Sequence, residues 1–198
     1  NYVLKPRFGG SSIGVEIIND GTTAQKLIKN SDLYSQGAVI EKYLENSTDL
    51  LVGVRNFPDF DISEIEKPLK NETLFSYNDK YLENGGLEGS KRELPAKLSE
   101  QIEKKLIDMV QKINHIIPTR GIYRYDFLLH ENKLYVNEIN TIPGSHALYL
   151  WKNLDNSKFE LLDSMIDEAL SKQFNNWSLT GSDGIALKSA KDIASKLG

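Results

Sequence analysis

The chain of 198 residues contains no cysteine. This absence excludes disulfides, thiolate nucleophiles and cysteine-ligated zinc. Its three histidines, His115, His130 and His146, lack the spacing of a metal site. A hard metal ion held by oxygen atoms is therefore the metal class that the composition leaves open.

Long apolar runs and an excess of positive charge are also missing. No apolar run approaches the length that spans a bilayer, and no signal-peptide pattern opens the chain. The net charge of -4 and the pI near 5.5 argue against broad binding to nucleic acids or anionic membranes. With 39% hydrophobic and 26% charged residues, we expect a cytoplasmic enzyme or binding domain with one sizeable core or two small ones.

The start of the chain is unusual for a whole protein. It begins at Asn1 without a methionine and enters a strand-like run, YVLKP, almost at once. We expect it to be a fragment of a longer protein.

The pattern of apolar residues predicts strands and helices without a βαβ rhythm, and this favours an α+β fold. The three β-rich runs between 38 and 69 are most simply interpreted as an antiparallel meander. From Lys70 to about Leu94 a polar segment lacks periodicity, as functional or disordered loops do. Strands are predicted at 2–6, 15–18, 38–45, 50–57, 61–69, 121–129 and 134–140, and helices at about 22–30, 96–116, 158–173 and 185–197.

Four polar residues stand on the predicted hairpin RYDFLLHENKLYVNEIN. Alternation places Arg124 and Asp126 on one face of the first strand, and Glu138 and Asn140 on one face of the second. A three-residue loop at 131–133 would set Asp126 opposite Glu138 and Arg124 opposite Asn140. Two carboxylates and an amide oxygen suit Mg²⁺. A solvated strand face, or a salt bridge between Arg124 and Asp126, is the alternative.

Three other segments invite a functional interpretation. RFGGSSIG, behind Lys5, offers backbone N–H groups and hydroxyls to an anion, although a plain glycine turn explains it as well. EKYLE is equally an edge strand with solvated charges, and SYNDKY is equally a solvated loop tip.

The order of these motifs is more specific than any one of them. KP, GGSSIG, EKYLE, DKY, RxD and EINTIPGS follow one another in a way that resembles the ATP-grasp superfamily, and within it the D-alanine:D-alanine ligase family, from residue 1 to about 173. The resemblance implies an ATP-grasp fold of antiparallel sheets and packed helices, with the nucleotide between two lobes. It further implies part of the central lobe at 1–45, the C-terminal lobe at 46–175 with a mobile loop at about 70–94, and a tail at 176–198. From the resemblance we expect this sequence to lack the family's N-terminal domain.

The resemblance also implies roles for individual residues in ATP binding. Lys5 and Lys42 would reach the phosphates or the adenine region, and Asp49 would hold the ribose hydroxyls. The adenine contacts would come from Glu41, Tyr43 and Leu44.

The remaining implied roles concern the reaction itself. Lys80 would approach the γ-phosphate, and Tyr81 and Ser11 would close the loop over the substrates. Arg124 and the N–H of Gly144 would stabilise the tetrahedral intermediate. Two Mg²⁺ ions, which Mn²⁺ can replace, would be held by Asp126, Glu138 and Asn140.

The family's activity is the ATP-dependent joining of two D-alanines through an acyl phosphate, for peptidoglycan precursor synthesis. The resemblance implies small-molecule substrates and no nucleic-acid or membrane partner. It is also compatible with a homodimer of the full-length protein. We expect the fragment alone to be inactive. SHALYLW offers Ala147 where relatives commonly carry a substrate-binding serine, so a carboxylate–amine ligase with other substrates is one alternative. A non-catalytic ATP-binding module is the other.

Overall fold

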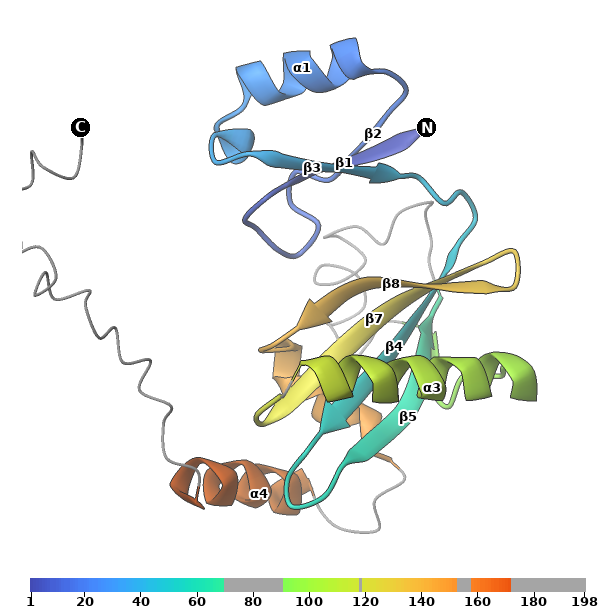
Figure 1. The fold of residues 1–198 in the computed structure, drawn as a ribbon, viewed down its shortest axis with the longest axis vertical. Coiled ribbons are helices and arrows are strands. Elements are labelled where there is room, and N and C mark those ends of the chain that lie inside the picture. The colour runs from blue at the N-terminus through green and yellow to red at the C-terminus, as the bar shows by residue number, and fades with distance from the viewer. Residues whose placement is uncertain (70–90, 118, 153–157, 172–198) are drawn as a thin grey trace, which may run out of the picture.

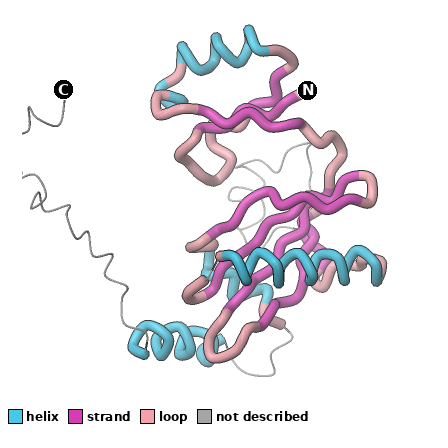
Figure 2. Tube along the Cα trace, viewed as in Figure 1, coloured by secondary structure: helices cyan, strands magenta, loops and turns pink. Residues whose placement is uncertain are grey.

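The computed structural model describes residues 1–69, 91–117, 119–152 and 158–171. Helices and antiparallel sheets form a small lobe and a larger one, and β8 is the strand of the larger sheet that lies nearest the small lobe (Figure 1). The same division into two strand-containing lobes is visible in Figure 2. This architecture is the α+β fold that the sequence predicts.

The small lobe is built on a three-stranded antiparallel sheet in the order β2-β1-β3. Its helix α1 begins after Asp20 because that carboxylate accepts a hydrogen bond from the Thr23 N–H at 2.8 Å. Its core contains Leu4, Ile18, Ala24 and Tyr34. The elements are β1 (Tyr2–Pro6), β2 (Glu16–Ile18), α1 (Gly21–Asn30), the 3-10 turn η1 (Asp32–Tyr34) and β3 (Ala38–Lys42).

The larger lobe is a five-stranded sheet in the order β6-β5-β4-β7-β8, with α3 (Glu100–Ile116) packed on one face. The strands are β4 (Thr48–Arg55), β5 (Asp61–Pro68), β6 (Arg92–Glu93), β7 (Ile122–His130) and β8 (Lys133–Asn140). The core under α3 contains Leu50, Val52, Val54, Ile65, Leu106, Val110, Tyr125 and Phe127. Because side chains alternate along a strand, the opposite face of β4 and β7 presents Leu51, Gly53, Arg124 and Asp126.

One end of that opposite face is covered by the 3-10 segment η3 (Gly144–Leu150) and by α4 (Lys158–Ser171). The residues buried between them are Ile122, Ala147, Leu150, Trp151 and Leu161. In the part of the chain that the structure describes, no helix is both long and apolar enough to cross a bilayer.

The predicted meander from 38 to 69 is wrong at its first strand. β3 pairs with β1, from Tyr2 opposite Lys42 to Pro6 opposite Ala38, whereas β4 pairs with β5 and β7. The chain therefore leaves one sheet after Lys42 and enters the other at Thr48. An alternating pattern identifies a strand, but the neighbour of that strand depends on residues far away in the sequence.

The hairpin of β7 and β8 differs from its prediction in the turn. Glu131 and Asn132 both have positive φ, 48° and 59°, so they form a two-residue turn of the type that suits tight hairpins, and His130 pairs with Lys133. A bulge between Asp126 and Phe127 then shifts the register by one residue. The extra residue of β8 is Asn137.

The helix predicted at 96–116 and the predicted loop also differ from the structure. The helix predicted from residue 96 begins at Glu100, because the Ser99 hydroxyl accepts from the Ile102 N–H and caps it. Within the predicted loop, Arg92 and Glu93 form the short strand β6 on the edge of β5. The predicted loop residues 70–90 and the predicted helix at 185–197 lie outside the described residues.

Replacing Gly53 by alanine is expected to lower the free energy of unfolding by about 1–3 kcal/mol. A Cβ on Gly53 would lie 3.0 Å from Trp151 Nε1 and 3.2 Å from Ser63 Oγ, so the turn after η3 would have to move off the sheet. Urea denaturation measures the change. Gly21→Ala is the control, because a Cβ there meets nothing within 4 Å. Equal stability changes in the two variants would contradict this packing account.

Candidate functional site

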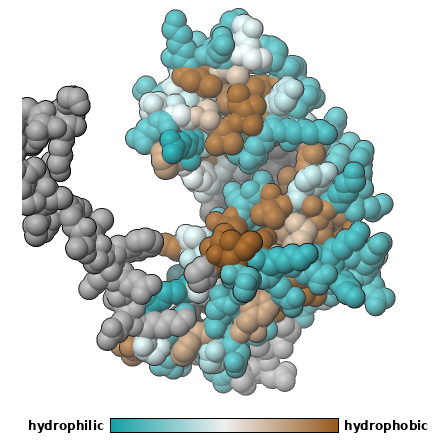
Figure 3. Space-filling view, in the orientation of Figure 1, coloured by the Kyte–Doolittle hydropathy of each residue, from teal (hydrophilic) through white to brown (hydrophobic). Residues whose placement is uncertain are grey.

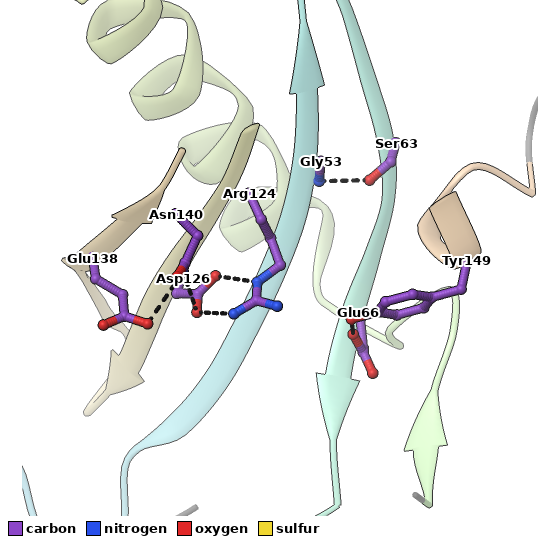
Figure 4. A network of polar contacts seen from close by, with 8 residues as sticks. All are labelled: Gly53, Ser63, Glu66, Arg124, Asp126, Glu138, Asn140 and Tyr149. Carbon is purple, nitrogen blue, oxygen red and sulfur yellow. Dashed lines mark hydrogen bonds and ion pairs between the residues drawn. The ribbon is translucent and has the colours of Figure 1, made fainter. Parts of the chain in front are cut away.

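The four polar residues predicted on the hairpin form one hydrogen-bonded network (Figure 4). Asp126 lies opposite Glu138, and Arg124 lies opposite Asn140. Arg124 donates to both oxygens of Asp126, from Nε at 2.7 Å and from Nη2 at 2.8 Å. The Nδ2 of Asn140 donates at 3.1 Å to Asp126 Oδ2 and at 3.1 Å to Glu138 Oε1. The pairings predicted from alternation are therefore confirmed, and the salt bridge between Arg124 and Asp126 is present as well.

Burial dominates the electrostatics of this network. The side chains of Arg124 and Asp126 are only 12% and 10% exposed. Burial raises the pKa of the Asp126 carboxyl to about 6; Arg124 opposes the rise, and Glu138 adds to it. Burial alone would lower the pKa of Arg124, but its hydrogen bonds and charge contact with Asp126 raise it. Burial thus outweighs the opposing effect of Arg124 on the pKa of Asp126.

The donor set fits a hard divalent cation. Among the described residues no three acidic or histidine side chains come together, so the candidate ligands are two carboxylates and one amide. Asp126 and Glu138 both point to the same Asn140 NH₂ group, so a positive dipole sits between two negative groups. A rotation of that amide would present its oxygen in place of its nitrogen. Three convergent oxygen donors would then suit Mg²⁺, with other oxygens completing its six-fold coordination.

The small lobe contributes Lys5 to the same region. Its Nζ lies 2.5 Å from Glu41 Oε2 on the adjacent strand β3. It also donates to Oδ1 of Asn137, the bulged residue of β8, at 3.4 Å. One ammonium group therefore bridges the two lobes, beside the strand that carries Glu138 and Asn140. Asn137 was not predicted as a site residue, because nothing in the local pattern reveals a bulge.

The structure places the other predicted nucleotide contacts along the junction of the lobes. Lys42 ends β3 and is exposed, and the partly exposed Tyr43 and Leu44 follow it. Asp49 lies on β4 opposite Leu128, on the same face of the sheet as Asp126. Ser11 lies in the turn between β1 and β2 with a positive φ of 53°. Lys80 and Tyr81 lie outside the described residues.

Apolar surface accompanies these polar groups at the junction. Val39 lies opposite Lys5, and Tyr135 lies opposite Leu128 on the face of the sheet that carries Asp126; both are exposed although their side chains are large and apolar. In Figure 3 brown apolar surface appears on both lobes beside the hollow between them. Exposed apolar surface next to a few charged groups is typical of ligand-binding grooves.

The turn that follows β8 has an unusual backbone. Ser145, His146 and Ala147 have φ values of 50°, 49° and 52°. The left-handed conformation costs a residue with a side chain about 1–2 kcal/mol. The His146 N–H donates to Pro143 O at 2.9 Å, and Ala147 is fully buried. This strained turn starts at Gly144, whose N–H is the donor to the intermediate that the family resemblance implies.

Sequence reasoning missed a second polar group beside the network. Glu66 on β5 is 3% exposed and accepts a hydrogen bond from Tyr149 Oη at 2.9 Å (Figure 4). Arg92 Nη1 lies 3.5 Å from Glu66 Oε1, and the Arg92 guanidinium lies 4.9 Å from the Tyr149 ring centroid. The alternating pattern of DISEIEKPL marks the strand, but no signal in it identifies a partner that is 83 positions away.

The stability of the protein is expected to depend on pH through Glu66. Burial raises the pKa of this carboxyl above its ordinary 4.5, although Tyr149, Arg92 and Arg124 oppose the rise. A carboxyl group whose pKa is raised by folding contributes stability below its ordinary pKa. That stability is lost as pH rises through the pKa of the folded state. As pH rises from about 4.5, wild type should therefore lose stability relative to Glu66→Gln. Urea denaturation at several pH values measures this difference, and a constant difference would contradict the shift.

The family model and the curated relatives that match this chain belong to the same family. Residues 2–167 match the family model described as D-ala D-ala ligase C-terminus. A D-alanine--D-alanine ligase of Thermosipho africanus is 32% identical over 168 residues, which cover 84% of this chain and 45% of the relative. The chain spans about half the length of the curated relatives that it matches.

Solved structures agree with this comparison. The D-alanine-D-alanine ligase of Helicobacter pylori aligns with a TM-score of 0.60 and 27% identity, over 87% of this chain and 49% of that one. The N5-carboxyaminoimidazole synthetase of Staphylococcus aureus, solved in complex with ADP, aligns with a TM-score of 0.59 and 25% identity, over 88% of this chain and 42% of that one.

Proposed function

Since the chain belongs to the family of D-Ala–D-Ala ligase C-terminal domains, we propose that it is the ATP-binding and catalytic part of a ligase that joins two D-alanines through an acyl phosphate. The observation that carries this proposal is the network of Arg124, Asp126, Glu138 and Asn140 on the face of the larger sheet opposite α3. The full-length protein would act in the cytoplasm on small molecules.

Nucleotide binding is proposed between the small lobe, residues 1–45, and the larger one, residues 46–175. Glu41, Lys42, Tyr43, Leu44 and Asp49 lie at this junction. The apolar surface of β3 and β8 suits adenine, and Lys5 suits the phosphates, because a cation that already bridges both lobes can exchange its partners for phosphate oxygens. The Staphylococcus aureus structure that was solved with ADP supports nucleotide binding by a protein of this fold.

Asp126, Glu138 and Asn140 are proposed to hold Mg²⁺, or Mn²⁺ in its place. The ion would neutralise phosphate oxygens during phosphoryl transfer, a reaction that depends on positioning and charge neutralisation. Burial is the main cause of the raised pKa of Asp126, and the nearby Glu138 carboxylate adds to it. Arg124 keeps Asp126 oriented through two hydrogen bonds.

Arg124 and the Gly144 N–H are proposed to stabilise the oxyanion that forms when the acceptor amine attacks the acyl phosphate. Arg124 is fixed by Asp126, and Gly144 begins the strained turn at the end of the same sheet face. Donors that are held in place before the reaction need no reorganisation during it. Ser11, Lys80 and Tyr81 are proposed to close over the substrates and to exclude water from the acyl phosphate.

A second candidate is a carboxylate–amine ligase with a different acceptor. Ala147 is fully buried and has no hydroxyl with which to bind a substrate carboxylate. A module that only binds ATP is disfavoured, since it has no need for a buried Arg124 beside two carboxylates.

The test is phosphate release by the full-length protein, supplied with ATP, Mg²⁺ and a panel of amino acids. The proposal expects release that depends on D-alanine and yields the dipeptide. Release with another amine acceptor would favour the second candidate, and the absence of amino-acid-dependent release would overturn both.

A further inference from the structure

We propose that Glu66 is a positioning residue for ligation, which acts through Tyr149 to hold the turn at 144–150, and with it the Gly144 N–H, in place beside Arg124. The inference rests on the proposed function for its catalytic consequence. Its structural part, that Glu66 and Tyr149 fix this turn, stands on geometry alone.

The contact between the two residues joins the turn to the sheet. Tyr149 lies in η3, five positions after Gly144, and its hydroxyl donates to Glu66 Oε2 at 2.9 Å. Glu66 is on β5, in the cross-strand row that continues through Leu51 of β4 to Asp126 of β7. Figure 4 shows the Glu66 carboxylate and the Tyr149 ring on the side of Arg124 away from Asp126. Asp126 therefore anchors Arg124, and Glu66 anchors, through Tyr149, the turn that carries the Gly144 N–H.

The environment of Glu66 is built to keep this contact. The residue is 3% exposed, and Arg92 lies 3.5 Å from its other oxygen while stacking 4.9 Å from the Tyr149 ring centroid. Burying a carboxylate is unfavourable without such partners, and an apolar pair would fasten a turn without that cost. The hydrogen bond to Glu66 fixes the orientation of the Tyr149 ring, which an apolar contact would not do.

The backbone of the turn explains why an anchor is needed. Ser145, His146 and Ala147 are all in the left-handed region, where residues with side chains persist only if the surroundings hold them. Ala147 and Leu150 are fully buried and hold the turn by packing. Tyr149 lies between them and adds the directional contact.

The kinetic test uses the full-length protein with Tyr149→Phe, which keeps the ring and removes the hydroxyl. We expect kcat for ligation to fall at least tenfold, with the KM for ATP within twofold of wild type. Glu93→Gln is the matched control, since it breaks the Lys67–Glu93 ion pair of 3.0 Å between the same strands, β5 and β6, and should leave kcat unchanged. An unchanged kcat in Tyr149→Phe, or an equal loss in the control, would overturn the inference.

Glu66 itself supplies a rescue experiment. Glu66→Gln keeps an oxygen that accepts from Tyr149, whereas Glu66→Ala does not. The glutamine variant should therefore retain at least several times the kcat of the alanine variant. Equal losses in the two variants would show that Glu66 acts through its charge or its packing and not through this hydrogen bond.

Hydrogen exchange tests the structural part independently of activity. The His146 N–H donates to Pro143 O at 2.9 Å inside the turn. Its exchange should be at least tenfold faster in Tyr149→Phe and Glu66→Ala than in wild type, while amides of α3 keep their rates. Unchanged exchange would overturn the anchoring role. If wild type released no phosphate with any amino acid, the proposed function would fail while this measurement still decided the anchoring.

Discussion

Arg124→Met is expected to lower the free energy of unfolding by about 3–5 kcal/mol, the usual effect of removing one partner from a buried ion pair. Methionine keeps most of the side-chain volume, so the loss comes from charge. Asp126 would lose two hydrogen bonds, of 2.7 and 2.8 Å, at a site where its side chain is 10% exposed. Urea denaturation at neutral pH measures the change, and phosphate release by the full-length variant should be lost as well.

Asp126 provides the control for this prediction. The double variant Arg124→Met with Asp126→Asn leaves no unpaired buried charge, so it should be more stable than Arg124→Met alone. The loss in Arg124→Met should also shrink at acidic pH, because Asp126 can then take up a proton. A double variant less stable than the single one would contradict the account of a buried pair.

Glu138→Gln is expected to reduce ATP-dependent phosphate release by the full-length protein roughly a thousandfold, from the several kcal/mol that a metal contributes to such a transition state. Glutamine retains the size of the side chain and its hydrogen bonding with Asn140, but it removes one of two negative charges that would hold the ion. Folding should be little affected, because Glu138 forms no ion pair among the described residues.

A matched control lies in the same hairpin. Glu131→Gln makes the same chemical change in the turn, where the side chain is 78% exposed, and it should leave phosphate release unchanged. A similar loss in both variants would mean that the hairpin as a whole, and not the Glu138 carboxylate, is required.

The hairpin shows how far the sequence alone could lead. Alternation was enough to put Arg124, Asp126, Glu138 and Asn140 on one face, because side chains on a strand point alternately to its two sides. The predicted pairing of Asp126 with Glu138 is correct although the predicted turn is wrong. The real turn is one residue shorter, and the bulge at Asn137 adds that residue back. The order of motifs predicted the ATP-grasp fold, which the solved structures confirm.

The features that could not be predicted depend on contacts between distant segments. β3 was assigned to the wrong sheet because its pattern carries no information about its partner β1. The contact of Glu66 with Tyr149 joins residues 83 positions apart, and the bridge from Lys5 to Asn137 joins residues 132 positions apart. Such pairs become visible only once the strand order and the path of η3 are known.

The central claim is that the carboxylates of β7 and β8 bind a nucleotide through a divalent metal. Calorimetric titration of the full-length protein with a non-hydrolysable ATP analogue, with Mg²⁺ and without it, tests this claim most directly. The account predicts that Mg²⁺ strengthens binding at least tenfold in wild type and has little effect in Glu138→Gln. The same Mg²⁺ dependence in both proteins, or none in wild type, would contradict it.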